Sequence, residues 1–150
     1  MKKLFVSVFA VALLLLTGCG GDMSENAKIK PKHADVITIN GDIMIAELDY
    51  IMAIESYKSG ELTKDQVVKK LSPLEAELSR IFSEVAKFDW YGNSMKDYAD
   101  AVEWEIAAVQ VAMRCIEAQD GIPSDIQLKT EDVRLDRESK YEIMVDEWFR

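Results

Sequence analysis

The sequence contains a single histidine and only two cysteines in 150 residues, and this scarcity excludes several classes of catalytic site. Serine–histidine catalysis needs a histidine beside a nucleophile, and the only histidine, His33, lies in a polar stretch that does not provide one. A metal site at His33 is also excluded, because no second histidine or cysteine lies nearby. Glu-x-x-His motifs of di-iron bundles, Cys-x-x-Cys pairs, glycine-rich phosphate loops and calcium loops are all absent. We therefore expect a protein that is not an enzyme and that carries no cofactor and no metal.

The low cysteine count also excludes an internal disulfide framework. Cys115 is the only cysteine after Cys19. Because Cys115 lies among Val111, Ala112 and Ile116, we expect a buried, unreactive thiol, with an intermolecular disulfide as the alternative.

Positive charge is scarce as well. Eighteen Lys and Arg stand against 27 Asp and Glu, which gives a formal net charge of -9, and loss of Lys2 and Lys3 from the front of the chain would change this to -11. Such an acidic surface argues against nucleic acid as a partner and against electrostatic docking on anionic lipids.

Long apolar runs are absent except at the front of the chain, where residues 4–16 are apolar apart from Ser7. This run of about 13 residues would be roughly 20 Å long as a helix, which is too short to cross a ~30 Å hydrocarbon core. With Lys2 and Lys3 before it, the run has the length and flank of a secretory signal peptide.

The run ends in Leu16-Thr17-Gly18-Cys19, which resembles the lipobox of bacterial lipoproteins. The resemblance covers only this front end. It implies that residues 1–18 are a cleaved signal peptide, and that Cys19 carries acyl chains such as palmitate and becomes the mature N-terminus. Two or more acyl chains hold a protein stably on a membrane. The resemblance therefore implies a protein of the cell envelope that is lipid-anchored to a bacterial membrane and faces outside the cytoplasm.

We expect residues 19–39 to form the lipidated N-terminus and a tether, and residues 40–150 to form one domain with a modest core. The tether is polar as far as about residue 35, and Gly20, Gly21 and Pro31 interrupt it. The following Val36-Ile37-Thr38-Ile39 favours β structure and would form an extended strap before the first helix.

The rest of the chain has helical periodicity and helix start signals, which predict an all-α, up-down four-helix bundle. The start signals are Asn40, the Thr63/Gln66 capping box, Ser94 and Thr130. The expected helices cover about 41–59, 64–90 (kinked or broken at Pro73), 95–119 and 131–149.

Three charged residues, Glu47, Glu105 and Arg137, fall on the inward faces of the predicted helices, and Arg134 is a possible fourth. Counted along up-down helices, they would meet in one layer of the bundle. One interpretation is a buried ionic layer that fixes helix register at little net gain in stability. The other is a pocket between the first, third and fourth predicted helices, in which the spare carboxylate binds a cation or an amine.

Aromatic residues also gather toward the bundle end where the first predicted helix begins. Such a cluster is commonly a lid on the core, but exposed rings would make a surface for a protein partner or a lipid interface. The candidates for this surface are Trp90, Tyr91, Trp104 and Trp148.

Together these features favour a non-enzymatic, membrane-anchored extracytoplasmic lipoprotein that acts through protein–protein contacts, as an accessory subunit, an inhibitor or an immunity-type factor. The alternative is a small-ligand-binding lipoprotein that uses the pocket between the helices. Fold class alone decides neither.

Overall fold

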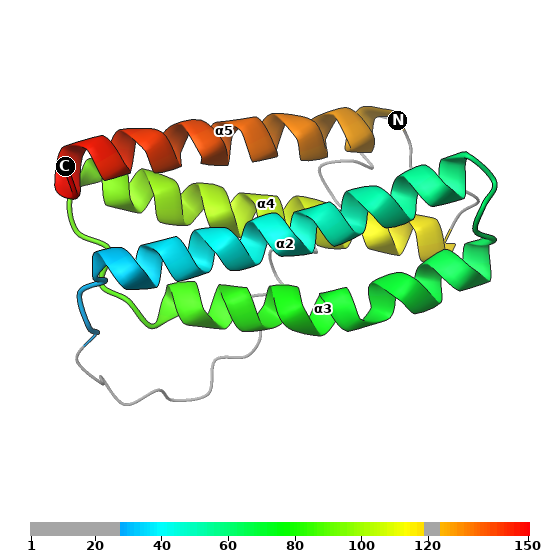
Figure 1. Cartoon of the computed structure of the whole chain (residues 1–150), viewed down its shortest axis with the longest axis horizontal. Coiled ribbons are helices and arrows are strands. Elements are labelled where there is room, and N and C mark those ends of the chain that lie inside the picture. Colours follow the sequence, from blue (N-terminus) through cyan, green and yellow to red (C-terminus); the bar gives the residue numbers. More distant parts are fainter. Residues whose placement is uncertain (1–27, 119–123) are drawn as a thin grey trace, which may run out of the picture.

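The computed structural model describes residues 28–118 and 124–150, and this part of the chain folds into a bundle of four α-helices (Figure 1). The helices are α2 (His33–Lys58), α3 (Lys64–Ala86), α4 (Asn93–Ala118) and α5 (Ser124–Trp148). The predicted all-α four-helix bundle is confirmed. The predicted signal peptide and Cys19 lie outside the described residues.

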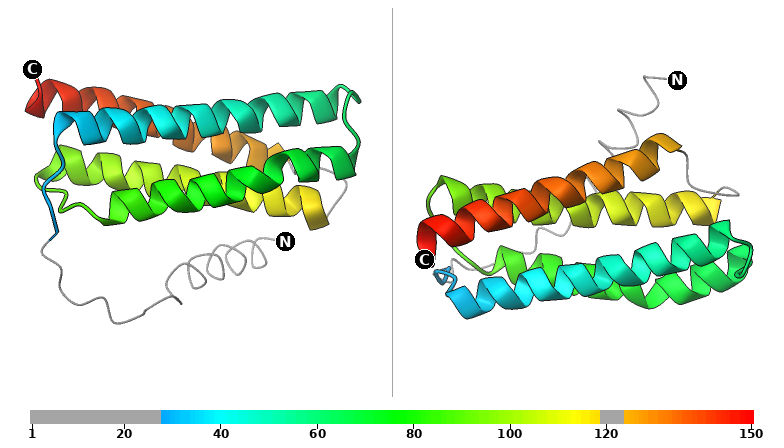
Figure 2. Two further views of the ribbon diagram at one scale, coloured as in Figure 1. Left: turned by 60° about the horizontal axis from the view of Figure 1, so that its bottom comes forward. Right: turned by 45° about the horizontal axis from the view of Figure 1, so that its top comes forward.

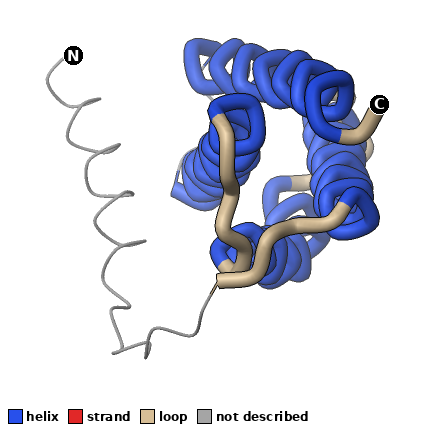
Figure 3. The backbone as a smooth tube through the Cα atoms, turned by 90° about the vertical axis from the view of Figure 1, so that its left-hand side faces the viewer, coloured by secondary structure: helices blue, strands red, loops and turns tan. Residues whose placement is uncertain are grey.

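Successive helices run in opposite directions and surround a common core (Figures 2 and 3). α3 packs between α2 and α4, and α4 packs most extensively against α5. α2 and α5 lie beside each other in the end view of Figure 3, but their backbones make few close contacts. Long side chains must therefore fill the seam between α2 and α5.

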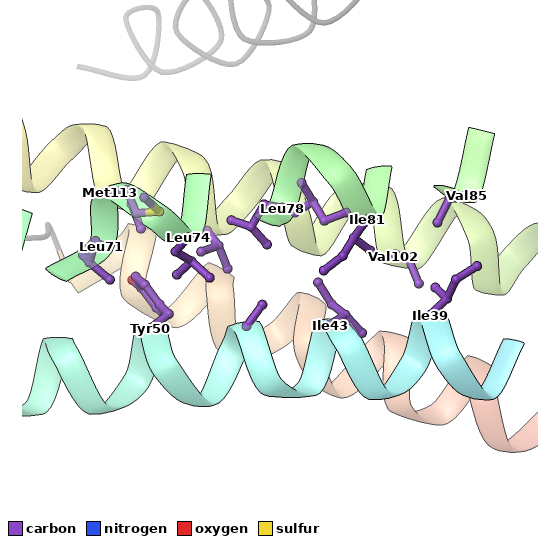
Figure 4. Close-up of a cluster of buried hydrophobic side chains, with 14 of the residues drawn as sticks. Ile39, Ile43, Tyr50, Leu71, Leu74, Leu78, Ile81, Val85, Val102 and Met113 are labelled. Carbon is purple, nitrogen blue, oxygen red and sulfur yellow. The ribbon is translucent and has the colours of Figure 1, made fainter. Parts of the chain in front are cut away.

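The core is built from the inward faces of the helices, and Figure 4 labels its residues from α2, α3 and α4. α3 shows the pattern most clearly, because its buried residues recur at intervals of three and four, so that they form one apolar stripe. These residues are Val67, Leu71, Leu74, Leu78, Ile81 and Val85. Ile39, Ile43 and Tyr50 of α2 and Val102 and Met113 of α4 point into the same space (Figure 4).

The first helix begins at His33, eight residues before the predicted start at Gly41, and the predicted strap is wrong. Val36 and Ile39 are buried in the core, because they continue the spacing of Ile43 toward the N-terminus. Helical packing of these side chains overrides the β preference of the local sequence. Asn40 is therefore an interior residue of α2 and not its cap. The helix starts instead where Asp35 Oδ2 accepts a hydrogen bond of 2.7 Å from the Lys32 N–H.

Two other helix boundaries test the predicted start signals. The Thr63/Gln66 capping box is present, with the Thr63 N–H donating to Gln66 Oε1 at 2.8 Å and the Gln66 N–H to Thr63 Oγ1 at 3.4 Å. α3 then runs through Pro73 as one helix, so the broken alternative is wrong. α5 begins at Ser124, upstream of the predicted Thr130 start.

The described chain is tied to one end of the bundle before α2 begins. Ile29 pairs with Phe88 in an isolated bridge, and its carbonyl accepts a hydrogen bond of 2.9 Å from the Asp89 N–H. At the same end, the His33 ring stacks on Phe149 with 4.5 Å between ring centroids. Ile29 and His33 thus contact the bundle, although both fall within the predicted tether of residues 19–39. Within the described residues, no helix combines the length and hydropathy needed to cross a membrane.

Candidate functional site: a buried ionic layer and an exposed apolar row

The four inward charges meet in the middle of the bundle, with Arg137 of α5 at their centre. Arg137 Nε donates to Glu105 Oε2 of α4 at 2.5 Å, and its Nη2 lies 3.4 Å from Glu47 Oε2 of α2. Arg137 and Glu105 are each 1% exposed. One guanidinium therefore joins three helices and fills part of the seam between α2 and α5.

Two further residues complete this layer, and the sequence analysis missed both. Asn40 Oδ1 accepts a hydrogen bond of 2.8 Å from Arg137 Nη1 and one of 3.4 Å from the Tyr98 hydroxyl. Burial raises the pKa of Tyr98, so its phenol stays protonated and can donate. Asn40 lies seven residues before Glu47, and Tyr98 lies seven residues before Glu105, so each pair occupies one helix face. That heptad spacing is the signal that could have identified Asn40 and Tyr98.

Arg134 lies at the solvent edge of the layer and is held by three carboxylates. Its Nε lies 2.9 Å from Glu47 Oε1, while its Nη atoms lie 3.1 Å from Glu131 Oε1 and 2.9 Å from Glu138 Oε1. Glu47 is thus shared between the buried Arg137 and the partly exposed Arg134. Burial raises the pKa of Glu47, and the two arginines oppose that rise.

Glu105 is the one carboxylate of the layer that is almost fully buried yet only half satisfied. Its Oε2 accepts from Arg137, but its Oε1 is buried and has no hydrogen-bond partner within the described residues. Burial raises the pKa of Glu105 to about 7, although Arg137 works in the opposite direction. The raised pKa favours the protonated form of Glu105, which reduces the cost of leaving Oε1 unpaired.

This arrangement serves both interpretations of the inward charges. As a structural layer, it specifies the register of three helices, because one guanidinium must satisfy acceptors on α2 and α4 at once. As a ligand site, it would use Glu105 Oε1 as its spare acceptor. The described residues contain no cluster of three or more histidine, cysteine, aspartate or glutamate side chains arranged to hold a metal ion. An open hollow lies elsewhere, along α3 between Asp65 and Pro73.

The aromatic candidates divide between a lid on the core and the surface. Trp90 Nε1 donates to the Val85 carbonyl at 2.8 Å, and its ring packs edge-on against Tyr98. The Tyr91 ring meets Trp148 with 4.9 Å between centroids, and Trp148 Nε1 donates to Ser94 Oγ at 2.7 Å.

These contacts give Trp90, Tyr91 and Trp148 structural roles at the end of the bundle. Lys30 Nζ also covers Tyr91, 4.5 Å from its ring centroid. Trp104 is different, because it lies on α4 and is nearly half exposed.

Six exposed apolar side chains form a row on α2, which the sequence analysis did not identify. Its members are between 41% and 63% exposed and recur at intervals that place them along one side of the helix. They are Ile37, Met44, Ile45, Leu48, Ile51 and Met52. We call these six residues the α2 outer row. Single exposed apolar residues are ordinary on a protein surface, whereas these six residues lie along one side of one helix.

Comparison with known protein families, with characterised proteins and with solved structures finds no match to this chain.

Proposed function

We propose that this protein is a membrane-anchored lipoprotein of the bacterial envelope, facing outside the cytoplasm, that has no enzymatic activity and acts by binding another envelope protein. The α2 outer row is the observation that carries this proposal. A single helix of a small bundle normally buries one face and exposes a polar one, whereas α2 is apolar on both. Its second apolar face is accounted for if a partner covers it.

α3 provides an internal comparison for α2. Both helices cross the whole bundle and bury one stripe, but the outward residues of α3 are mainly polar or small, for example Lys69, Ala76 and Ser83. The apolar exposure is therefore a property of α2 that α3 does not share, while α5 exposes Leu135 and Ile143.

The front of the chain supports the placement of this contact in the envelope. The lipobox-like Leu16-Thr17-Gly18-Cys19 predicts an anchor, and Ile29 pairs with Phe88 of the bundle. About ten residues would then separate the lipid from the bundle. A flexible chain of that length spans roughly 15–20 Å, so a partner of this domain would lie close to the membrane.

The experiment is in-cell crosslinking followed by affinity purification of the tagged protein, with a Cys19→Ala variant alongside. We expect a stoichiometric protein partner with the intact chain, and a reduced yield of it with Cys19→Ala, because the variant loses its place at the membrane. Absence of any stoichiometric partner in both samples would contradict the proposal.

One observation favours a second candidate function, a small-ligand-binding lipoprotein. Within the part of the chain that the structure describes, no donor reaches the buried Glu105 Oε1, so this acceptor is available to the amine or cation of a ligand. Native mass spectrometry of the gently purified protein tests this candidate. A mass increment that is absent from Glu105→Gln, in a protein that is still folded, would favour the ligand, and equal bare masses would contradict it.

A further inference from the structure

The α2 outer row contains a glycine that the fold of this chain does not require. Gly41 follows Ile37 by four residues and precedes Met44 and Ile45 by three and four, so it lies within the row. A Cβ atom at Gly41 would meet nothing within 4 Å. Glycine in a helix interior costs roughly 0.5–1 kcal/mol relative to alanine, and no contact within the described residues compensates for that cost.

A missing side chain in an apolar row allows another backbone to approach closely. Small residues have this role wherever two helices pack at short distance. The row from Ile37 to Met52 is about 22 Å long at 1.5 Å per residue, which matches a helix of about 15 residues lying along it. The shape of the row therefore fits a helix better than a loop.

The charges beside the row define the second property of its occupant. Two carboxylates of α5, Glu131 and Glu138, lie on one side of the row. Both bond to Arg134, and Arg134 also bonds to Glu47, which precedes Leu48 of the row. Glu142 extends the same side of α5, four residues after Glu138.

The other side of the row is acidic as well. The exposed Asp49 lies between Ile45 and Met52 along the helix. The described cations near the row are each paired with carboxylates: Arg134 with three, Arg80 with Asp42 and Glu77, and Lys58 with Glu55 at 2.9 Å. Both edges of the row are thus negative.

We propose that the α2 outer row binds an amphipathic helix of a partner protein, with the partner's apolar face on Ile37–Met52 and its Lys or Arg side chains opposite Glu131, Glu138 and Asp49. This proposal rests on the proposed function and names the chemistry of the partner. Apolar contact supplies affinity, and the acidic edges select a basic helix and orient it.

The same charges disfavour the two other occupants of an apolar row. A second copy of this chain would bring one acidic edge against another, in a protein whose formal net charge is -9. An anionic bilayer surface would be repelled by Glu131, Glu138 and Glu142 in the same way.

Site-directed photo-crosslinking in cells tests the occupant. A photoreactive amino acid replaces Leu48 in the full-length tagged protein, and replaces Ala76, an exposed residue of α3, in the matched control. Mass spectrometry then identifies the crosslinked peptide. We expect the Leu48 position to capture a segment with apolar residues at helical spacing and Lys or Arg beside them, and the Ala76 position not to capture it.

A charge-reversed form, Glu131→Lys with Glu138→Lys, tests the acidic edge. We expect at least a tenfold lower crosslink yield from position 48, while circular dichroism shows the same folded protein. An unchanged yield would overturn the basic-helix assignment.

Other products at position 48 overturn the proposal in distinguishable ways. Crosslinks to this chain itself identify a second copy, crosslinks to lipid identify a membrane contact, and no product shows that nothing covers the row. If position 48 gives no partner while affinity purification still recovers one, the docking site is wrong but the proposed function survives. If neither method finds a partner, both fail.

Discussion

At the scale of single residues, the inward charges were predictable and their other partners were not. Glu47, Glu105 and Arg137 were identified because helix periodicity places a charge on an otherwise apolar face. Asn40 escaped because it had a simpler explanation as a helix cap, and Tyr98 escaped because its hydroxyl joins the layer only through Asn40. Side-chain geometry was needed to see that Asn40 Oδ1 accepts from both Arg137 and Tyr98.

The raised pKa of Glu105 predicts a pH-dependent contribution to stability. Its pKa of about 7 in the folded protein lies above the ordinary 4.5 of the unfolded chain, so the folded state holds an extra proton between these values. The stability from this group is present below pH 4.5 and is lost as pH rises through 7, by about 3 kcal/mol. In urea unfolding, the free energy of unfolding of the wild type should fall with rising pH relative to that of Glu105→Gln. The titration of Glu47 affects both proteins alike and cancels in this comparison. Parallel pH profiles would contradict the account.

Removing the central guanidinium should be far more costly than removing the whole pair. Arg137→Met leaves Glu105 buried without its counter-ion, so we expect the free energy of unfolding to fall by about 3–5 kcal/mol. Adding Glu105→Leu removes the buried carboxylate that has lost its counter-ion, so the double variant should recover most of the lost stability. Chemical denaturation of the single and double variants measures both effects. A double variant no more stable than Arg137→Met would show that the pair is not the coupled unit described above.

At the scale of secondary-structure elements, the sequence predicted that four helices exist and placed them in the right order, but it misplaced some of their ends. The Thr63/Gln66 box marks a real boundary because both reciprocal hydrogen bonds form. The start of α2 was missed because Val36-Ile37-Thr38-Ile39 favours a strand locally, and only burial of Val36 and Ile39 in the assembled core makes helix the better state. Tertiary packing is not visible in a short window of sequence.

Two glycines should respond to alanine in opposite directions. Gly41→Ala places a methyl group in open space within a helix, so we expect stability to rise by about 0.5–1 kcal/mol. Gly92→Ala should lower stability by about 1–3 kcal/mol, because Gly92 has φ +76° and the Trp148 ring occupies the position of the added Cβ. Thermal unfolding of both variants measures this contrast. A Gly41→Ala protein less stable than wild type would mean that the fold itself needs this glycine.

At the scale of the whole molecule, α2 is apolar on two sides, and its six exposed apolar residues outnumber those described on α5, among them Leu135 and Ile143. Sequence periodicity could not reveal this, because an extra apolar face on a helix looks the same whether it is buried in the fold or open to a partner. The structure resolves the question for this chain. α2 packs on α3 (Figure 1), the Arg137 and Arg134 network lies in its seam with α5, and the side chains of the outer row are exposed. Partner binding through α2 is the central claim that follows.

The most direct measurement of that claim is partner recovery by the tagged protein carrying Leu48→Gln with Met52→Gln, compared with Lys69→Gln with Ala76→Gln on the outward face of α3. All four positions are exposed, so both variants should keep their stability to within about 0.5 kcal/mol per substitution. We predict that the α2 variant loses the partner at least tenfold and that the α3 variant retains it. Equal recovery by the two folded variants would contradict the claim that the α2 outer row is where this protein binds.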